Sequence, residues 1–102
     1  MADFRSISVA DARNLIDQGP VQLVDIRDPQ AFLQGHMPGA TRLDNSNVST
    51  FIDSADRQVP VVVCCYHGIS SRSAAQFLAE QGFAEVYSLD GGFEAWRGAF
   101  PE

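Results

Sequence analysis

The sequence predicts a single domain of the α/β class with a mostly parallel central sheet. Apolar, β-branched runs alternate with segments whose apolar residues recur at helical spacing, as they do when helices connect parallel strands. The run at 59–64 is apolar throughout, which is typical of a strand buried on both faces by helices. The length of 102 residues fits one domain, residues 1–102, and no repeat, low-complexity tract or charge block divides it.

The first helix and strand have clear start and stop signals. Ser8 and Asp11 have the spacing of a capping box, in which both side chains bind free amides at the start of a helix. Apolar residues follow at helical spacing until Gly19 and Pro20 end the helix. Residues 21–26 are then predicted to form a short buried strand.

The next predicted elements are shorter. Asp28 directly precedes a proline, which predicts an N-cap and a brief helix that ends near Gly35. A turn-rich connection leads to a short strand at 41–44. Another short helix follows, with Ser46 or Asn47 as its cap.

The second half of the chain has the stronger pattern. The strand at 59–64 leads into a helix from Ser71, whose apolar stripe ends at Gly82. Residues 84–89 are predicted to form another strand. An Asp-Gly-Gly turn then begins a final short helix that includes Trp96.

Charge and composition exclude several function classes. The 13 acidic and seven basic residues give a net charge of −6, which argues against nucleic acid or an anionic membrane as a partner. All seven basic residues are arginines, so a lysine base or Schiff base is excluded. No apolar run approaches the roughly 20 residues that span a bilayer, and the start lacks the features of a secretory signal. The two adjacent cysteines form no disulfide framework, which favours a reducing, cytoplasmic location.

The main functional hypothesis rests on a cysteine at the end of the strand at 59–64. Cys65 lies just before the next helix, where open parallel sheets bind their ligands. The positive end of that helix, inward-pointing amides around Gly68, and His67 when protonated all favour a thiolate. We expect the pKa of Cys65 to lie well below that of free cysteine, unless Cys65 is only a small buried hydrophobe. Cys64 points to the opposite face and is expected to pack in the core.

Two kinds of chemistry suit a thiolate inside an anion-binding loop: phosphoryl or arsenate chemistry, and sulfur transfer. Cysteine-dependent phosphatases place an arginine after the cysteine and five further residues, because its guanidinium clamps the phosphate oxygens. Here Ser71 occupies that position, and Arg72 comes one residue later. The six-residue loop is also tighter, which suits a single sulfur atom better than a tetrahedral oxyanion.

Four stretches of the chain, in the same order, resemble the rhodanese family over nearly the whole length. They are VDIRD at 24–28, FLQGHMPGA at 32–40, CYHGIS at 65–70 and LDGGFEAW at 89–96. The resemblance implies a five-stranded parallel sheet flanked by helices on both faces, with 65–70 as the active-site loop. It also implies ping-pong transfer of a sulfane sulfur through a persulfide on Cys65.

The function that this resemblance implies is that of a thiosulfate sulfurtransferase. The Cys65 thiolate would attack the outer sulfur of thiosulfate and release sulfite. A thiophilic acceptor, such as cyanide or a dithiol on a small molecule or a protein, would then remove the sulfur. No metal or organic cofactor is implied. Two alternatives stay open: a phosphatase or arsenate reductase of related fold, and a persulfide carrier or interaction module.

The residues expected to bind the substrate form the loop and the start of the next helix, namely Tyr66, His67, Gly68, Ile69, Ser70, Ser71 and Arg72. The first five are expected to act mainly through their backbone amides. Ser70 and Ser71 either cap the helix or bind the persulfide, and at least one of them is expected to cap it. Arg72 either steers a dianion or pairs with a nearby carboxylate.

Charged residues outside the loop are expected to be structural. Asp25, Arg27 and Asp28 have the positions of an ion pair and a helix cap at a strand end. His36 lies in a Gly-His-Met-Pro-Gly turn and is expected to make a structural hydrogen bond. No spacing of the histidines and cysteines predicts a metal site.

Overall fold

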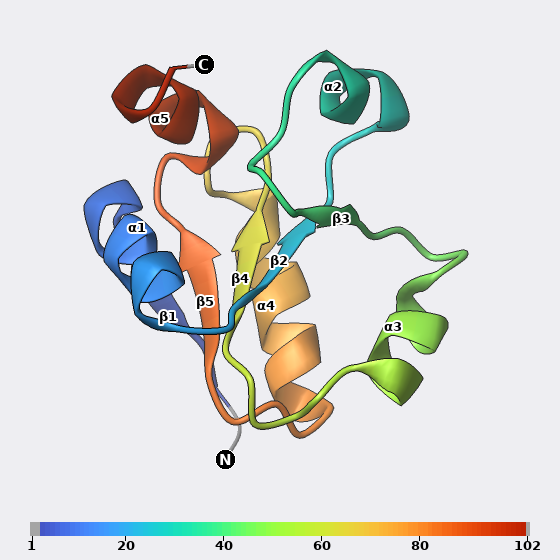
Figure 1. Ribbon diagram of the computed structural model, residues 1–102. Coiled ribbons are helices and arrows are strands. Elements are labelled where there is room, and N and C mark those ends of the chain that lie inside the picture. The colour runs from blue at the N-terminus through green and yellow to red at the C-terminus, as the bar shows by residue number, and fades with distance from the viewer. Residues whose placement is uncertain (1–2, 102) are drawn as a thin grey trace.

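The computed structural model describes residues 3–101. The strands are β1 Arg5–Ile7, β2 Gln22–Asp25, β3 Thr41–Arg42, β4 Val61–Cys64 and β5 Val86–Leu89. The helices are α1 Val9–Gln18, α2 Pro29–Gln34, α3 Val48–Ser54, α4 Ser70–Glu80 and α5 Gly92–Ala99. All strand pairs are parallel, and the order across the sheet is β1-β5-β4-β2-β3 (Figure 1). The structure confirms the predicted α/β class and parallel sheet.

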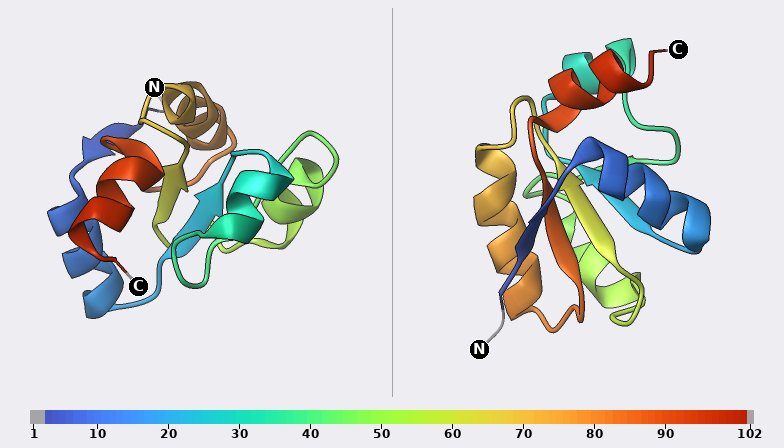
Figure 2. Two further views of the ribbon diagram at one scale, coloured as in Figure 1. Left: turned by 90° about the horizontal axis from the view of Figure 1, so that it is seen from above. Right: turned by 90° about the vertical axis from the view of Figure 1, so that its left-hand side faces the viewer.

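Helices cover both faces of the sheet, α1 and α5 on one face and α3 and α4 on the other (Figure 2). The central strand β4 is buried at all four positions. Val61 and Val63 belong to the apolar cluster beneath α3 and α4. Val62 and Cys64 belong to the cluster beneath α1 and α5, as predicted for Cys64. The continuous apolar run therefore reflects alternate residues that are buried against two different helix layers.

The predicted N-caps of the first two helices are confirmed, but the second bond of the capping box, from the Ser8 N–H to the Asp11 carboxylate, is not formed among the described residues. The hydroxyl of Ser8, the N-cap of α1, accepts a hydrogen bond from the N–H of Asp11 at 3.1 Å. The carboxylate of Asp28, the N-cap of α2, accepts one from the N–H of Ala31 at 2.9 Å. These bonds satisfy amides that a helix leaves free at its start, and they place α2 beyond the carboxyl end of β2 (Figure 1).

The predicted strand lengths and the predicted cap of α4 were wrong. All four predicted strands, at 21–26, 41–44, 59–64 and 84–89, are shorter in the structure, where they are β2, β3, β4 and β5 with the bounds given above. The N-cap of α4 is Ile69, and no side chain caps this helix, so neither Ser70 nor Ser71 is a cap. The Ser71 hydroxyl points instead toward the sheet, where it meets a buried partner on β5.

The residue pattern did not predict β1, although the family resemblance implied a fifth strand. Only Ile7 of its three residues is buried, so neither an apolar run nor a full alternation marks the strand. Its pairing with β5 is parallel, and the N–H of Asp90 extends this pairing by donating to the Ile7 carbonyl at 2.8 Å. β1 is therefore a strand because it pairs with β5, which lies near the other end of the chain, and the residues of β1 alone do not predict it.

Candidate active site

Cys65 lies at the carboxyl end of the central strand, where β4 passes into the loop before α4. Its Sγ accepts hydrogen bonds from the N–H groups of Gly68 at 3.1 Å and Ser71 at 3.3 Å. Only 2% of Cys65 is exposed, so the sulfur lies within the turn of the loop, not on its outer surface. Two backbone dipoles directed at one sulfur atom favour its anionic form.

The pKa of Cys65 is set by two opposing effects. Burial raises the pKa of Cys65 because it penalises the charged thiolate. Hydrogen bonds oppose burial: the largest come from the hydroxyl and the N–H of Ser71, followed by the N–H groups of Gly68 and His67. Together they hold the pKa of Cys65 below the ordinary value for a thiol, in the direction that the sequence predicted.

The neighbouring Cys64 has the opposite character. Burial and the nearby Asp25 carboxylate raise the pKa of Cys64 to about 12. Its thiol donates a hydrogen bond of 3.5 Å to the carbonyl of Cys65. Cys64 is therefore a neutral core residue, and the thiolate chemistry of this pair belongs to Cys65.

The start of α5 fixes the loop from the other side. The N–H of Phe93 donates to the Cys65 carbonyl at 2.8 Å, and the N–H of Glu94 donates to the Tyr66 carbonyl at 3.3 Å. Gly92 has a φ of +60°, and a Cβ at this position would lie 2.5 Å from the Cys65 carbonyl oxygen. A glycine is thus required for α5 to approach the loop, a role that the Gly-Gly turn did not reveal in the sequence.

Ser88 on β5 is a buried site residue that sequence reasoning missed. Its Oγ lies 2.7 Å from the Oγ of Ser71, and both serines are at most 1% exposed. If Ser88 donates to Ser71, the Ser71 proton is free to be donated to the Cys65 sulfur. A single serine in an apolar strand carries no signal of this contact, which depends on the packing of α4 against β5.

Replacing Ser71 with alanine should raise the pKa of Cys65, because the hydroxyl that stabilises the thiolate is lost while the N–H remains. The pH dependence of Cys65 alkylation by iodoacetamide measures this shift, with the midpoint moving to higher pH. Ser73→Ala, on the exposed side of the same helix, is the matched control and should leave the midpoint unchanged. An unchanged midpoint in Ser71→Ala would show that the backbone alone sets the pKa of Cys65.

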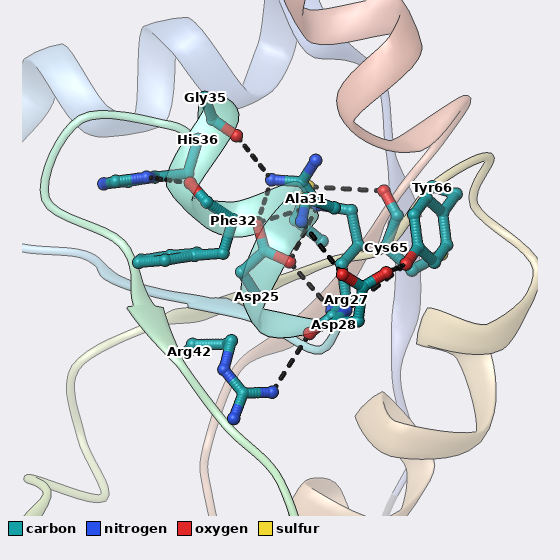
Figure 3. Close-up of polar contacts among 11 residues, drawn as sticks. Asp25, Arg27, Asp28, Ala31, Phe32, Gly35, His36, Arg42, Cys65 and Tyr66 are labelled. Carbon is teal, nitrogen blue, oxygen red and sulfur yellow. Dashed lines mark hydrogen bonds and ion pairs between the residues drawn. The ribbon is translucent and has the colours of Figure 1, made fainter.

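Arg27 and Asp25 form a buried ion pair at the carboxyl end of β2, as the sequence predicted (Figure 3). Arg27 is 5% exposed and Asp25 is fully buried. Nε and Nη2 of Arg27 donate to the Asp25 carboxylate at 2.7–3.1 Å, and Nη2 also donates to the Gly35 carbonyl at 2.8 Å. The guanidinium carbon lies 4.3 Å from the centre of the Phe93 ring, so this pair also supports α5.

A second contact joins the active-site loop to the turn before α2. The Tyr66 hydroxyl donates a hydrogen bond to the Asp28 carboxylate, and the N–H of Asp28 donates to the Tyr66 oxygen at 3.3 Å (Figure 3). The bonds from Tyr66 and from the N–H of Ala31 lower the pKa of Asp28. Asp28 therefore holds the Tyr66 ring beside the loop in addition to capping α2.

Five of the predicted substrate-binding side chains lie at the surface, namely those of Tyr66, His67, Ile69, Ser70 and Arg72. Arg72 lines a shallow hollow with Phe4 and Phe77 on the outer side of α4. By contrast, the backbone requires a glycine at Gly68, since its φ is +86° and a Cβ would lie 2.8 Å from the N of Gly91. The structure thus brings backbone groups of the loop to the sulfur but leaves these five side chains outside it.

His36 has the structural role that the sequence predicted. Its Nδ1 lies 2.7 Å from the Phe32 carbonyl oxygen, and its ring stacks on the Phe32 ring at a centroid distance of 3.8 Å. Within residues 3–101, no group of three or more His, Cys, Asp or Glu side chains could hold a metal ion. No helix in the same range is long and apolar enough to cross a membrane.

A parallel α/β domain that holds a cysteine sulfur among backbone amides at the end of its central strand has the features of cysteine-dependent group-transfer domains. Comparison with known proteins is more specific. The family profile described as Rhodanese-like domain matches residues 8–99, so the chain belongs to the rhodanese family, as its four motifs indicated.

Curated relatives and a solved structure agree with this assignment. The chain is 55% identical to a protein named thiosulfate sulfurtransferase GlpE from Ectopseudomonas mendocina (strain ymp), over 99% of this chain and 92% of that protein. It is 54% identical to the protein of the same name from Pseudomonas entomophila (strain L48), with the same coverage. A rhodanese-related protein from Thermoplasma volcanium superposes with a TM-score of 0.80 at 26% identity, over 95% of this chain and 94% of that one.

Proposed function

We propose that this protein is a cytoplasmic thiosulfate sulfurtransferase in which Cys65 carries the transferred sulfur. The observation that carries the proposal is the Cys65 Sγ, which accepts two backbone N–H hydrogen bonds and has a lowered pKa. The names of the curated relatives support thiosulfate as the donor. Two free cysteines, one of them a stabilised thiolate, suit a reducing compartment.

In the first half-reaction, the Cys65 thiolate attacks the outer sulfur of thiosulfate. A bond forms between Sγ and that sulfur, and the sulfur–sulfur bond of thiosulfate breaks with its electron pair on sulfite. The products are a Cys65 persulfide with one negative charge and sulfite with two, which equals the charge of the reactants. The lowered pKa of Cys65 favours the thiolate, which is the nucleophile of this step.

In the second half-reaction, a thiophilic acceptor removes the outer sulfur and Sγ leaves as a thiolate. The N–H groups of Gly68 and Ser71, which bind Sγ before the reaction, stabilise this leaving group as well. They are fixed by the backbone, so little reorganisation is needed when charge returns to the sulfur. Their geometry also suits the terminal sulfur of the persulfide, if that sulfur replaces Sγ among the amides.

The exposed cation Arg72 acts on the donor before it binds, and the side chain of His67 is exposed beside it. The protein carries a net charge of −6, which repels a dianion such as thiosulfate. Neither side chain contacts Sγ, but both lie within or next to the loop that holds it. We assign Arg72 to electrostatic attraction at the entrance, with binding itself left to the backbone amides.

A phosphatase or arsenate reductase is the second candidate, and the loop geometry disfavours it. The position at which a phosphatase needs an arginine holds Ser71, whose hydroxyl is buried against Ser88. Arg72 is exposed and lines a hollow with Phe4 and Phe77. A phosphate held in the loop would therefore lack the bidentate guanidinium that clamps its oxygens.

Incubation with thiosulfate, followed by measurement of the intact mass, tests the proposal. We expect the protein to gain the mass of one sulfur atom and to lose it again when cyanide is added. Cys65→Ser should gain nothing, whereas Cys64→Ser should react like the wild type because Cys64 is protonated and buried. Sulfur on Cys64, or no gain at all, would contradict the proposal.

Steady-state kinetics separate the remaining candidates. A covalent intermediate predicts parallel lines in double-reciprocal plots of rate against thiosulfate at several acceptor concentrations. Intersecting lines would count against ping-pong transfer. Hydrolysis of an aryl phosphate that is abolished by Cys65→Ser would favour the phosphatase. A protein that accepts sulfur only from a partner enzyme would gain mass with that enzyme but not with thiosulfate.

A further inference from the structure

A small hollow adjoins the active-site loop between α2 and α5. Its volume is about 210 Å³, and its walls include Arg27, Gln34, Tyr66, Phe93 and Arg97. Tyr66 directly follows Cys65, and the N–H of Phe93 donates to the Cys65 carbonyl at 2.8 Å. Two residues that line the hollow are therefore joined directly to Cys65, Tyr66 by a peptide bond and Phe93 by a hydrogen bond. The sulfur chemistry described above makes no use of it.

The guanidinium of Arg27, which lines this hollow, still has N–H groups without a hydrogen-bond acceptor. Nε and Nη2 of Arg27 are occupied by Asp25 and the Gly35 carbonyl, but Nη1 makes no hydrogen bond with any described residue. No buried side-chain nitrogen or oxygen in the described part of the chain lacks a partner. Nη1 therefore keeps some contact with solvent although Arg27 is only 5% exposed, and since Arg27 lines the hollow, the N–H groups of Nη1 are available to a ligand there.

A second arginine stands at the rim. Arg97 is 64% exposed and pairs only loosely with Glu94, at 3.5 Å. An exposed pair of this kind is weak, so the guanidinium can turn toward an anion at little cost. Two of the three charged side chains around the hollow are therefore cations, on a protein whose net charge is −6. Asp25 pairs with Arg27 and Glu94 with Arg97, so the N–H groups that these two guanidinium groups still offer, and not a net positive charge, favour an anion. The rings of Tyr66 and Phe93 favour a short apolar segment attached to it.

We propose that this hollow binds the carboxylate of the sulfur acceptor, so that the preferred acceptor is a small thiol with a carboxylate a few bonds from its sulfur. The inference rests on the proposed sulfurtransferase function and specifies its second substrate. Nη1 of Arg27 and the guanidinium of Arg97 hold the carboxylate, and Tyr66 and Phe93 contact the methylene groups. The thiol then reaches the persulfide across the Tyr66 side of the loop.

The reaction balances without a further reagent. The acceptor thiolate attacks the outer sulfur of the Cys65 persulfide, and a new sulfur–sulfur bond forms on the acceptor. The bond between that sulfur and Sγ breaks, and its electron pair stays on Cys65. The persulfide and the acceptor thiolate carry one negative charge each before transfer, and the Cys65 thiolate and the acceptor persulfide do so afterwards. The carboxylate keeps its charge throughout.

Single-turnover discharge of the persulfide tests the proposal with a pair of similar thiols. The persulfide protein is mixed with 3-mercaptopropionate or with 2-mercaptoethanol, and the loss of the sulfur mass is followed with time. The quantity compared is the rate constant for 3-mercaptopropionate divided by that for 2-mercaptoethanol. A change in the reactivity of the persulfide itself alters both rate constants alike and leaves this ratio unchanged. In Arg97→Gln this ratio should fall by about fivefold relative to wild type, the effect of one weak ionic contact. In Glu94→Gln it should rise.

Arg5→Gln is the matched control, since it removes the same charge from an exposed position on β1, which lines a different hollow. Its ratio should equal that of the wild type. Equal ratios in Arg97→Gln, Glu94→Gln and the wild type would overturn the inference.

Binding of propionate to the unloaded protein separates this inference from the proposed function. Propionate contains no thiol, so its binding does not depend on sulfur transfer. It should shift the backbone amide resonances of Phe93 and Arg97, and Arg97→Gln should weaken the effect. No shift at any propionate concentration would overturn the inference even if a persulfide forms. A shift in a protein that never forms a persulfide would support the anion site and overturn the sulfurtransferase proposal.

Discussion

Replacing Gly92 with alanine should dismantle the loop that holds the Cys65 sulfur. The new Cβ would lie 2.5 Å from the Cys65 carbonyl oxygen and 2.6 Å from the carbonyl carbon and oxygen of Tyr66. These are backbone atoms, so the clash is relieved only if α5 and the loop separate. Separation breaks the hydrogen bonds from Phe93 and Glu94 to the loop carbonyls. The φ of +60° adds the cost of a left-handed conformation, about 1–2 kcal/mol for a residue with a Cβ.

Together with an overpacking cost of about 1–3 kcal/mol, the free energy of unfolding should fall by roughly 2–5 kcal/mol. Urea denaturation measures this loss. In the fraction that stays folded, the alkylation midpoint of Cys65 should move to higher pH, because the amides that lower its pKa are no longer held in place.

Gly98→Ala is the control within the same helix. Gly98 lies in α5, and nothing is found within 4 Å of a Cβ built there. Alanine at such a helical position should stabilise the protein by about 0.5–1 kcal/mol. If Gly92→Ala matched Gly98→Ala in stability and in the pH profile of Cys65, the contact between α5 and the loop would not control the site.

The sequence predicted the strand and the cysteine at the centre of the site because local signals specify both. The run that ends in Cys64 is apolar for the simple reason that both of its faces are buried. Cys65 follows directly and precedes a helix, so its position among the amides of a strand–helix loop follows from chain order alone. The caps at Ser8 and Asp28 are equally local, since each side chain binds an amide three residues ahead.

The features that the residue pattern missed depend on contacts between distant parts of the chain. Ser88 becomes a site residue only because α4 packs on β5 and brings Ser71 within 2.7 Å of it. β1 exists as a strand only because β5 pairs with it. The prediction of a serine cap on α4 was wrong for the same reason, since the Ser71 hydroxyl bonds to Ser88 on β5 instead of capping its own helix. Local rules for serine do not include a partner on another element.

Replacing Arg27 with methionine should destabilise the protein more than any loss of a surface charge. Asp25 is fully buried, and Nε and Nη2 of Arg27 bind both of its carboxylate oxygens. Without the guanidinium, the carboxylate keeps a hydrogen bond from the backbone N–H of residue 27 at 2.9 Å but has no countercharge. Breaking a buried pair by removing one partner typically costs about 3–5 kcal/mol. Urea denaturation at neutral pH should show a loss of this size.

A matched surface variant and a double variant identify the cause of that loss. Arg13→Met removes an arginine whose pair with Asp17 is exposed, and it should remain close to the wild type in stability. Asp25→Asn combined with Arg27→Met should recover part of the loss, because no uncompensated charge then remains in the core. If the double variant were as unstable as Arg27→Met, the deficit would come from the lost packing of the guanidinium on Phe93, 4.3 Å away, and not from the stranded carboxylate.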